Sequence, residues 1–229
     1  MTTTVDPRVV ARDASRRLED ATAQEIMTWA YEEFGSGLVV TSSLADTVLI
    51  HLAEQVAPGI DVIFLDTGYH FIETIGTRDA VVAVHNVNLI SVTPDQSVAE
   101  QDTAWGKDLF GRDPDQCCAL RKTQPLDRAL KGYTAWASGI RRADSPARAK
   151  TQIVTWDSRR QLVKISPIAK WSDQEVADYI EQNSLMVNPL LYEGYTSIGC
   201  EPCTSVPVPG DSRSGRWSGL AKTECGIHQ

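Results

Sequence analysis

The sequence predicts an α/β fold with a doubly wound, mostly parallel sheet. Short apolar runs rich in Val and Ile, at residues 37–43, 61–68 and 86–92, alternate with segments of helical spacing. Apolar runs of this kind are typical of strands buried on both faces, and strand–helix alternation is typical of βαβ units. The 229 residues suffice for one large domain, and neither a repeat nor a linker divides them. We therefore expect a single α/β domain over residues 1–212, followed by a mobile C-terminal tail over 213–229.

The helices are predicted from capping signals and from apolar residues at helical spacing. Thr22 and Glu25 form a capping-box signal before a helix that Gly35 should end. The other predicted helices are, in chain order, residues 44–56, 71–84, 115–132 and 173–183. The third of these should be broken before Pro125, because proline disfavours helical backbone at the preceding residue.

Two more segments complete the predicted sheet. Residues 134–140 read as a strand, and residues 152–168 read as a hairpin. Regular periodicity fades after Asn188, where Gly, Pro and Ser become frequent and three of the five cysteines lie.

Charge and composition exclude several classes of protein. The chain carries 22 basic and 30 acidic side chains, for a net charge of −8, whereas a general nucleic-acid binder needs a basic face. Residues 121–150 nevertheless hold eight basic side chains against two acidic ones, which predicts a local site for a small anion or, as the alternative, a solvated charged face. No apolar run is long enough for a transmembrane helix, and the first residues do not resemble a secretory signal. We expect a cytoplasmic protein whose cysteines serve metal binding or catalysis.

Polar turns follow two of the predicted strands. Ser42 and Ser43 follow the first strand, and Asp66, Thr67 and Gly68 follow the second. Ligands of open α/β sheets bind beyond the carboxyl ends of the strands, so both turns are candidates for nucleotide binding. Each could equally be an ordinary helix cap or turn.

Four cysteines form two pairs with the spacing of a metal site. Cys117 and Cys118 are adjacent, and Cys200 and Cys203 form a CxxC. Four thiolates satisfy a tetrahedral zinc ion or an iron–sulfur cluster, although adjacent ligands are unusual for structural zinc. The alternative is a pair of buried apolar cysteines with a separate redox CxxC. Lys122 lies four residues after Cys118, so on a helix it would sit beside the pair and offset thiolate charge.

A fifth cysteine, Cys225, remains near the C-terminus. Arg213, Arg216 and Lys222 precede it in the sequence, and cations lower the pKa of a thiol and favour the nucleophilic thiolate. Cys225 is therefore a candidate nucleophile on a tail that moves. His228, three residues further on, is a candidate helper of this thiol, but a histidine near a chain end is more often a solvated bystander, and its role is left open.

Several ordered segments carry a family resemblance over almost the whole chain. They read IFLDTGYHFIET, CCALRKTQPL, WASGIRRADSPARA, VNPLLYEGYTSIGCEPCT and SGRWSGLAKTECGIH. The chain resembles the assimilatory adenylyl-sulfate (APS) reductases, which are relatives of the 3′-phosphoadenylyl-sulfate (PAPS) reductases. The resemblance implies a fold of the adenine nucleotide α-hydrolase, or PP-loop-like, type. It also implies an enzyme of sulfate assimilation and cysteine biosynthesis that reduces APS to sulfite and AMP with reduced thioredoxin, through an enzyme S-sulfocysteine.

The resemblance assigns roles residue by residue. Cys225 matches the nucleophile, and Cys117, Cys118, Cys200 and Cys203 match the ligands of one 4Fe-4S cluster. The residues that match substrate-binding positions are Lys122, Arg213, Arg216, Arg141, Arg142, Ser42, Ser43, Asp66, Thr67 and Gly68. We expect the cluster to shape the electrostatics around Lys122 and the sulfate, with the electrons coming from thioredoxin.

The chain departs from the family pattern at one place. The loop after the first strand reads TSSLADTV, where the family usually has a run of small residues that contains glycine. The absence of an SGGxDS loop and the acidic net charge disfavour a related 4Fe-4S tRNA sulfurtransferase. A nucleotide-binding module with structural zinc is the non-enzymatic alternative. No sequence feature excludes PAPS as a second substrate, and the oligomeric state, a homo-oligomer included, is left open.

Overall fold

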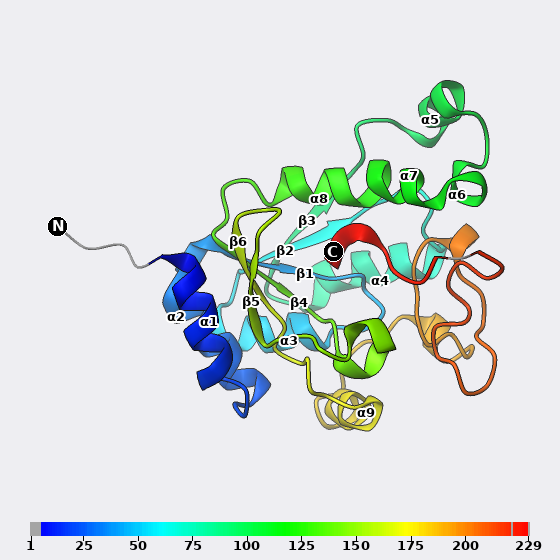
Figure 1. The fold of residues 1–229 in the computed structure, drawn as a ribbon. Helices are drawn as coiled ribbons and strands as arrows, with labels where there is room; N and C mark the ends of the chain where they lie inside the picture. Colours follow the sequence, from blue (N-terminus) through cyan, green and yellow to red (C-terminus); the bar gives the residue numbers. More distant parts are fainter. Residues whose placement is uncertain (1–5, 221, 229) are drawn as a thin grey trace.

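The computed structural model describes residues 6–220 and 222–228, and in these residues six strands form one sheet (Figure 1). The strand order is β3-β2-β1-β4-β6-β5. The strands are β1 Leu38–Thr41, β2 Asp61–Leu65, β3 Asn88–Val92, β4 Ala135–Ser138, β5 Val154–Asp157 and β6 Leu162–Ile165. Only the edge strand β5 pairs antiparallel, as the first arm of the predicted hairpin, whose second arm is β6. The predicted α/β class with a mostly parallel sheet is confirmed.

Most of the predicted helices are present. In chain order the helices are α1 Pro7–Arg17, α2 Ala23–Phe34, α3 Val48–Val56, α4 Ile72–Val84, α5 Val98–Trp105, α6 Leu109–Arg112, α7 Pro114–Cys118, α8 Gln124–Ala129 and α9 Asp173–Gln182. The capping boxes that open α2 and α9 are both formed. The predictions did not include α1, α5 and α6, although Ser97 and Glu100 form a third capping box at the start of α5.

The helix predicted over 44–56 begins only at Val48. Residues 44–47 form instead the loop that follows β1, and Leu44 has a φ of 59°, in the left-handed region. A leucine in this conformation is strained, and such strain persists only where the surroundings hold the backbone in place. The side chain of Leu44 is fully buried, so its packing supplies part of that hold.

A π-helical turn, Ala119–Thr123, replaces the break that we expected before Pro125. It joins α7 directly to α8 and leaves Pro125 in the first turn of α8, where a missing backbone N–H costs little. Single π turns inside helices are frequent at functional sites. This one widens the helix between the adjacent cysteines and α8, and it carries Lys122.

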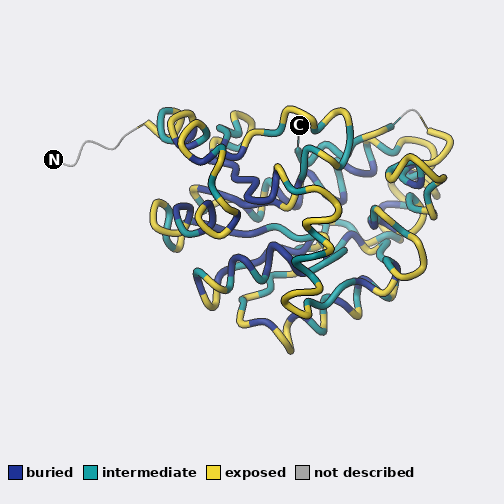
Figure 2. The backbone as a smooth tube through the Cα atoms, turned by 90° about the horizontal axis from the view of Figure 1, so that it is seen from below, coloured by how far each residue is buried: buried dark blue, intermediate teal, exposed yellow. Residues whose placement is uncertain are grey.

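The two faces of the sheet bury separate apolar clusters. On β1, Leu38 and Val40 face the larger cluster, which α1, α2 and α3 cover, while Val39 faces the other side. The smaller cluster lies under α8, and the tail residue Ile227 packs against it. Figure 1 shows α8 and the C-terminal segment on the side of the sheet opposite α3, and Figure 2 shows the buried backbone concentrated between the helical layers.

The strand order places the loops after β1, β2 and β4 at one edge of the sheet. The chain runs from β1 outward to β2 and β3, and it then returns to β4 on the other side of β1. Because β1, β2 and β4 are parallel, the loops that follow them open at the same edge, where such sheets bind ligands. The turns at 42–43 and 66–68 lie at this edge, as predicted.

The segment after Asn188 has only short 3₁₀ turns and isolated bridges in its described part. Thr204 forms a bridge with Arg216, and the Ser205 N–H donates to the Gly215 carbonyl at 2.8 Å. A Cβ at residue 215 would lie 1.9 Å from the Ser205 carbonyl oxygen, so only glycine fits there. The start of the predicted tail is therefore hydrogen-bonded to the cysteine loop. No helix among the described residues has the length and apolar character needed to cross a membrane.

Candidate active site

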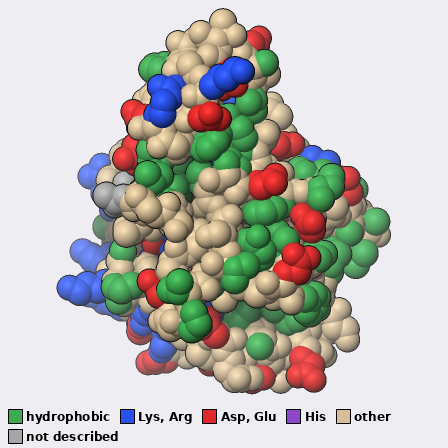
Figure 3. All heavy atoms as spheres, turned by 90° about the vertical axis from the view of Figure 1, so that its right-hand side faces the viewer, with side chains coloured by type: hydrophobic (Ala, Val, Ile, Leu, Met, Phe, Trp, Pro, Cys, Tyr) green, Lys and Arg blue, Asp and Glu red, His purple; other side chains and the backbone are tan. Residues whose placement is uncertain are grey.

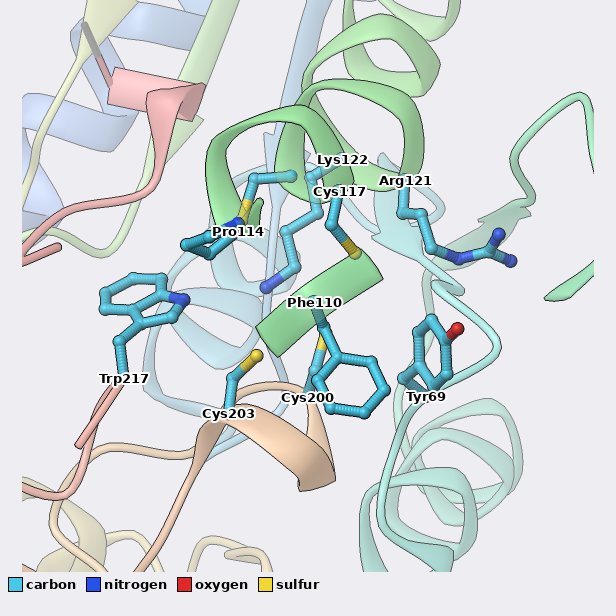
Figure 4. Close-up of a pocket in the computed structure, with 10 residues that line it drawn as sticks. Tyr69, Phe110, Pro114, Cys117, Arg121, Lys122, Cys200, Cys203 and Trp217 are labelled. Atoms are coloured by element: carbon cyan, nitrogen blue, oxygen red, sulfur yellow. The ribbon is translucent and has the colours of Figure 1, made fainter. Parts of the chain in front are cut away.

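The two cysteine pairs line a single pocket. Cys117 and Cys118 come from α7, whereas Cys200 and Cys203 flank the 3₁₀ turn Glu201–Cys203. Figure 4 shows the Lys122 ammonium pointing into the space between these thiols. The walls are largely aromatic or apolar and consist of Tyr69, Phe110, Pro114 and Trp217. The chain thus brings together four thiols from segments that lie more than 80 residues apart.

The turn after β2 holds the second pair of cysteines in place. His70 forms a bridge with Cys200, and the Glu201 N–H donates to the Tyr69 carbonyl at 2.7 Å. The hydroxyl of Thr67 lies 3.3 Å from the Cys200 sulfur. Thr67 therefore contacts a predicted metal ligand.

Arg121 ties the same turn to the helix that carries the first pair. Its Nε donates to the Thr67 carbonyl, and its Nη1 donates to the Gln101 amide oxygen at 3.1 Å. Gly68 has a φ of 72°, and a Cβ there would lie 3.1 Å from the Arg121 guanidinium. Asp66 accepts from the Gly68 N–H and pairs with Arg78 at 3.3 Å. The Asp66-Thr67-Gly68 turn is thus built to bring both cysteine pairs together.

The donor set fits an iron–sulfur cluster. Burial and the neighbouring thiols raise the pKa of Cys117 to about 11, and burial raises the pKa of Cys203, so four free thiolates are unfavourable here. A metal group removes this cost because it binds thiolates directly. In the described part of the chain, no three His, Cys, Asp or Glu side chains are grouped as ligands of one metal ion. A four-iron cluster takes one cysteine at each corner, which suits four thiols arranged around a pocket.

The tail brings Cys225 to this pocket. The neighbouring Cys118 thiol, Lys122, the Ile227 N–H and Lys222 together lower the pKa of Cys225 to about 5, against the effect of burial. If Cys118 binds a metal, its proton is lost, and the cations with the Ile227 N–H remain to favour the thiolate. Cys225 therefore has the environment of a nucleophile.

A row of cations extends from this thiol. Burial opposes the charge of Lys122, but the Cys200, Cys225 and Cys118 sulfurs together raise its pKa. The Arg213 and Arg216 guanidiniums both reach the Ser197 hydroxyl, at 3.4 and 3.3 Å. Burial lowers the pKa of Arg216, which has no ion pair with a carboxylate among the described residues.

Several arginine donors in this region have no partner. In the described structure, four arginine nitrogens are buried and have no hydrogen-bond partner: Arg141 Nη1, Arg160 Nη2, Arg213 Nε and Arg216 Nε. Buried N–H groups are nearly always satisfied, so these donors indicate a ligand with several acceptor oxygens. Planar guanidinium groups suit the oxygens of sulfate and phosphate.

Comparison with known proteins shows the family of this chain. Residues 37–206 match the phosphoadenosine phosphosulfate reductase domain family. The adenosine 5′-phosphosulfate reductase of Mycolicibacterium smegmatis is 57% identical over 222 residues, which cover 96% of this chain and 94% of the relative. The protein of the same name from Streptomyces coelicolor is 57% identical over 227 residues, which cover 99% and 96%. The chain belongs to the phosphoadenosine phosphosulfate (PAPS) reductase family.

Solved structures agree with this assignment. The phosphate complex of the PAPS reductase of Candida auris has a TM-score of 0.73 and 27% identity, and the match covers 85% of this chain and 96% of that one. The FMN adenylyltransferase of Candida glabrata, bound to FAD and pyrophosphate, has a TM-score of 0.59 at 9% identity, with 89% and 75% covered. The second likeness concerns the fold alone, and it agrees with the predicted PP-loop-like type.

Not all of the predicted residues meet in this PAPS reductase fold. Arg142 turns away from the pocket, and its guanidinium donates to Glu19 at 2.8 and 3.1 Å and to the Thr151 carbonyl. Ser42 and Ser43 lie at the carboxyl end of β1 and do not line the cysteine pocket. The Ser42 hydroxyl accepts from the Leu44 N–H at 3.1 Å, so it also serves the loop itself.

The structure adds residues that the predictions missed. His228 is no solvated bystander, because its ring stacks on Trp136 with centroids 5.8 Å apart, and its Nδ1 is buried. Burial and the nearby Lys164 and arginines hold the pKa of His228 well below its usual range, so its imidazole is neutral. Arg160 donates to the Ile227 carbonyl at 2.9 Å, and its guanidinium lies over Trp136. Contacts of this kind join segments that lie far apart in the sequence, so no local sequence pattern predicts them.

Proposed function

We propose that this protein is an APS reductase that forms sulfite and AMP with reduced thioredoxin as the electron donor. The relatives that match nearly the full chain carry the name adenosine 5′-phosphosulfate reductase. The observation that carries the proposal is the position of Cys225 beside Lys122 and the cysteine pocket, next to arginine donors without partners. A thiol, a cation and free guanidinium donors are what attack on a sulfate group requires.

The chemistry is covalent and proceeds in two stages. The Cys225 thiolate attacks the sulfate sulfur, the bond from sulfur to the bridging oxygen breaks, and AMP leaves with the electron pair. A thioredoxin thiolate then attacks the Cys225 sulfur, and sulfite leaves with the electrons of the S–S bond. The second thioredoxin thiol resolves the mixed disulfide, so thioredoxin is oxidised and the Cys225 thiol is restored.

The substrate would lie along the row of cations. Lys122, Arg213 and Arg216 would hold the phosphosulfate oxygens, with the free Nε groups of both arginines available for them. Ser42, Ser43 and the backbone of residues 66–68 would bind the nucleotide at the carboxyl edge of β1 and β2. Arg141 keeps a free Nη1 for this purpose, whereas Arg142 is committed to Glu19 and is assigned a structural role.

Cys117, Cys118, Cys200 and Cys203 would hold one 4Fe-4S cluster. When bound, the cluster would supply electronegative sulfur beside Lys122 and so act on the electrostatics of the sulfate site. The Lys122 ammonium points into the space between these thiols, and Cys225 also acts on its charge, so it could bridge the pocket and an oxyanion. Bound thiolates of this kind and a thioredoxin donor favour a reducing cytoplasm.

The thioredoxin partner requires an exposed surface next to the tail. Four large apolar side chains are exposed in the tail and in the segment that precedes it, namely Tyr192, Val206, Val208 and Leu220. Figure 3 shows hydrophobic side chains gathered on this side of the molecule among scattered acidic ones. Exposed apolar patches of this kind mark protein-interaction sites. We assign this surface to thioredoxin.

The test is sulfite production by anaerobically purified protein. The protein should contain iron and acid-labile sulfide, and it should form sulfite from APS only when reduced thioredoxin is present. PAPS assayed in parallel decides between strict and dual substrate specificity. Zinc in place of iron, or a cluster-loaded protein that makes no sulfite from either nucleotide, would contradict the proposal.

A further inference from the structure

The segment after β4, with the sequence RRADSPAR at residues 141–148, has a role that nucleotide binding does not explain. It forms two short 3₁₀ turns, Arg142–Asp144 and Pro146–Arg148. Arg142 faces Glu19, but the side chains of Ser145 and Arg148 face the C-terminal tail. They meet there the carboxylate of Glu224, the residue directly before Cys225.

Glu224 is held in a built site. The Arg148 guanidinium donates through Nε to Oε1 at 3.0 Å and through Nη2 to Oε2 at 2.8 Å, a bidentate pair. The Ser145 hydroxyl donates to Oε1 at 2.9 Å, and Arg213 approaches Oε2 at 3.5 Å. The side chains of Arg148 and Glu224 are only 15% and 12% exposed. Bidentate arginine–carboxylate pairs fix geometry more strictly than a single charge contact does.

The other side of Arg148 is fixed as well. Its Nη1 donates to Asp144 Oδ2 at 2.9 Å, and Asp144 Oδ1 pairs with Arg141 at 3.0 Å. Charges therefore alternate from Arg141 through Asp144 and Arg148 to Glu224. Arg141, Asp144 and Arg148 lie in the loop that follows β4, and together they form a fixed binding site for the Glu224 carboxylate of the tail.

The tail is held on the far side of Cys225 too. Arg160 donates to the Ile227 carbonyl at 2.9 Å, and Ile227 packs against the apolar cluster under α8. Cys225 thus lies between two anchored residues. Because consecutive Cα atoms are about 3.8 Å apart, fixing Glu224 and Ile227 leaves the intervening thiol little freedom.

We propose that Arg148 and Glu224 are positioning residues, which clamp the tail so that the Cys225 sulfur lies at Lys122 and the cysteine pocket. The proposal rests on the proposed function in that it takes Cys225 as the nucleophile. Attack on the sulfate needs the thiol at this position, whereas the thioredoxin step needs it exposed. A bidentate pair between two loops can serve both steps, because it forms and breaks without disturbing the sheet.

The test compares Arg148→Gln, Glu224→Gln and the double variant with wild-type holoenzyme. The first readout is the single-turnover rate of label transfer from radiosulfur-labelled APS to Cys225 at saturating substrate, without thioredoxin. We expect each single variant to slow this rate about 100-fold, because a small misplacement of a reacting group has effects of that size. The double variant should be no slower than either single one, since both remove the same contact. Arg148→Lys, which keeps the charge but loses the fork, should fall between Arg148→Gln and wild type.

The second readout needs no substrate. Hydrogen exchange at the amides of residues 222–228 should be faster in both single variants than in wild type, while the iron content and AMP affinity of Arg148→Gln stay unchanged. Arg16→Gln and Glu193→Gln are matched controls, because both side chains are exposed and have no ion pair in the described structure. Both controls should behave as wild type in the two measurements.

Wild-type transfer rates and wild-type exchange in Arg148→Gln and Glu224→Gln would overturn the clamp. A wild-type enzyme that takes no label would instead refute the proposed function, before any variant is compared. The exchange readout would then still decide whether the clamp exists. The two failures are therefore distinguishable.

Discussion

The sheet and the C-terminal segment of residues 189–228 are held by different forces. The strands β1, β2 and β4 are almost fully buried, and apolar packing on both faces fixes them. The C-terminal segment has little regular structure. Apart from the packing of Ile227 on the smaller cluster, it is attached through bridges, arginine–carboxylate pairs and backbone hydrogen bonds. Apolar packing gives a scaffold that does not move, whereas polar contacts can be exchanged for contacts with substrate or partner. The nucleophile lies on the second kind of structure because it has to serve two reactants in turn.

The largest effect should come from the nucleophile itself. Cys225→Ser should reduce sulfite formation by more than about 10⁴-fold, because a serine hydroxyl is not ionised at neutral pH. Iron content, AMP binding and thermal unfolding should match wild type, since the change lies outside the apolar clusters. Steady-state assays and iron analysis check this, and a variant that keeps sulfite production would remove Cys225 from the mechanism.

A core substitution should produce the opposite pattern. Ile50→Ala in α3 truncates a side chain that is 0% exposed, and it should lower the free energy of unfolding by about 2–5 kcal/mol. Denaturant titration measures this loss, and kcat of the folded protein should change little. A large fall in kcat of the folded protein would contradict the separation between the sheet as a scaffold and the C-terminal segment as the carrier of the nucleophile.

Lys122→Met should affect chemistry with a distinct pH signature. We expect kcat/KM for APS to fall about 100-fold, because a charge contact to the reacting group is lost. Besides Cys118, this ammonium is one of the groups that lower the pKa of Cys225, and it remains when Cys118 binds a metal. Its removal raises that pKa, so the thiolate should be lost at a higher pH in the variant. The pH dependence of Cys225 alkylation in holoenzyme measures this, and an unshifted profile would contradict the role of Lys122.

The smallest effect concerns the partner surface. Val208→Ser should raise KM for thioredoxin about fivefold and leave KM for APS unchanged, because a peripheral apolar contact contributes about 1 kcal/mol. Val82→Ser is the matched control, since Val82 on α4 and Val208 are both 62% exposed. Equal thioredoxin kinetics in the two variants would move the docking surface elsewhere.

The sequence predicted the scaffold better than the attachments. Alternating apolar runs and capping residues are local signals, and they located six strands and the helices α2, α3, α4 and α9 in the described chain. The adjacent cysteines and the CxxC predicted a site of four thiols, and in the structure these four thiols line one pocket. Their shared pocket depends on the bridge between His70 and Cys200, which no local pattern encodes.

The attachments of the tail could not be predicted for the same reason. Arg148 and Glu224 are separated by 76 residues, and Arg160 and Ile227 by 67. Arg148, Glu224 and Arg160 each read as an ordinary surface charge, and Ile227 takes part through its backbone carbonyl. His228 looked solvated because it lies near the chain end, whereas its ring stacks on the buried ring of Trp136 in the small cluster. Only the topology that puts β4 next to β1 and under the tail brings these partners together.

The central claim is that Cys225 takes the sulfonate group from the nucleotide, and trapping tests it most directly. Anaerobic holoenzyme is mixed with radiosulfur-labelled APS without thioredoxin and run on a non-reducing gel beside Cys225→Ser. The account predicts label on wild type alone, which reduced thioredoxin releases as sulfite. Label on the Cys225→Ser protein, or sulfite formed without any labelled enzyme, would contradict it.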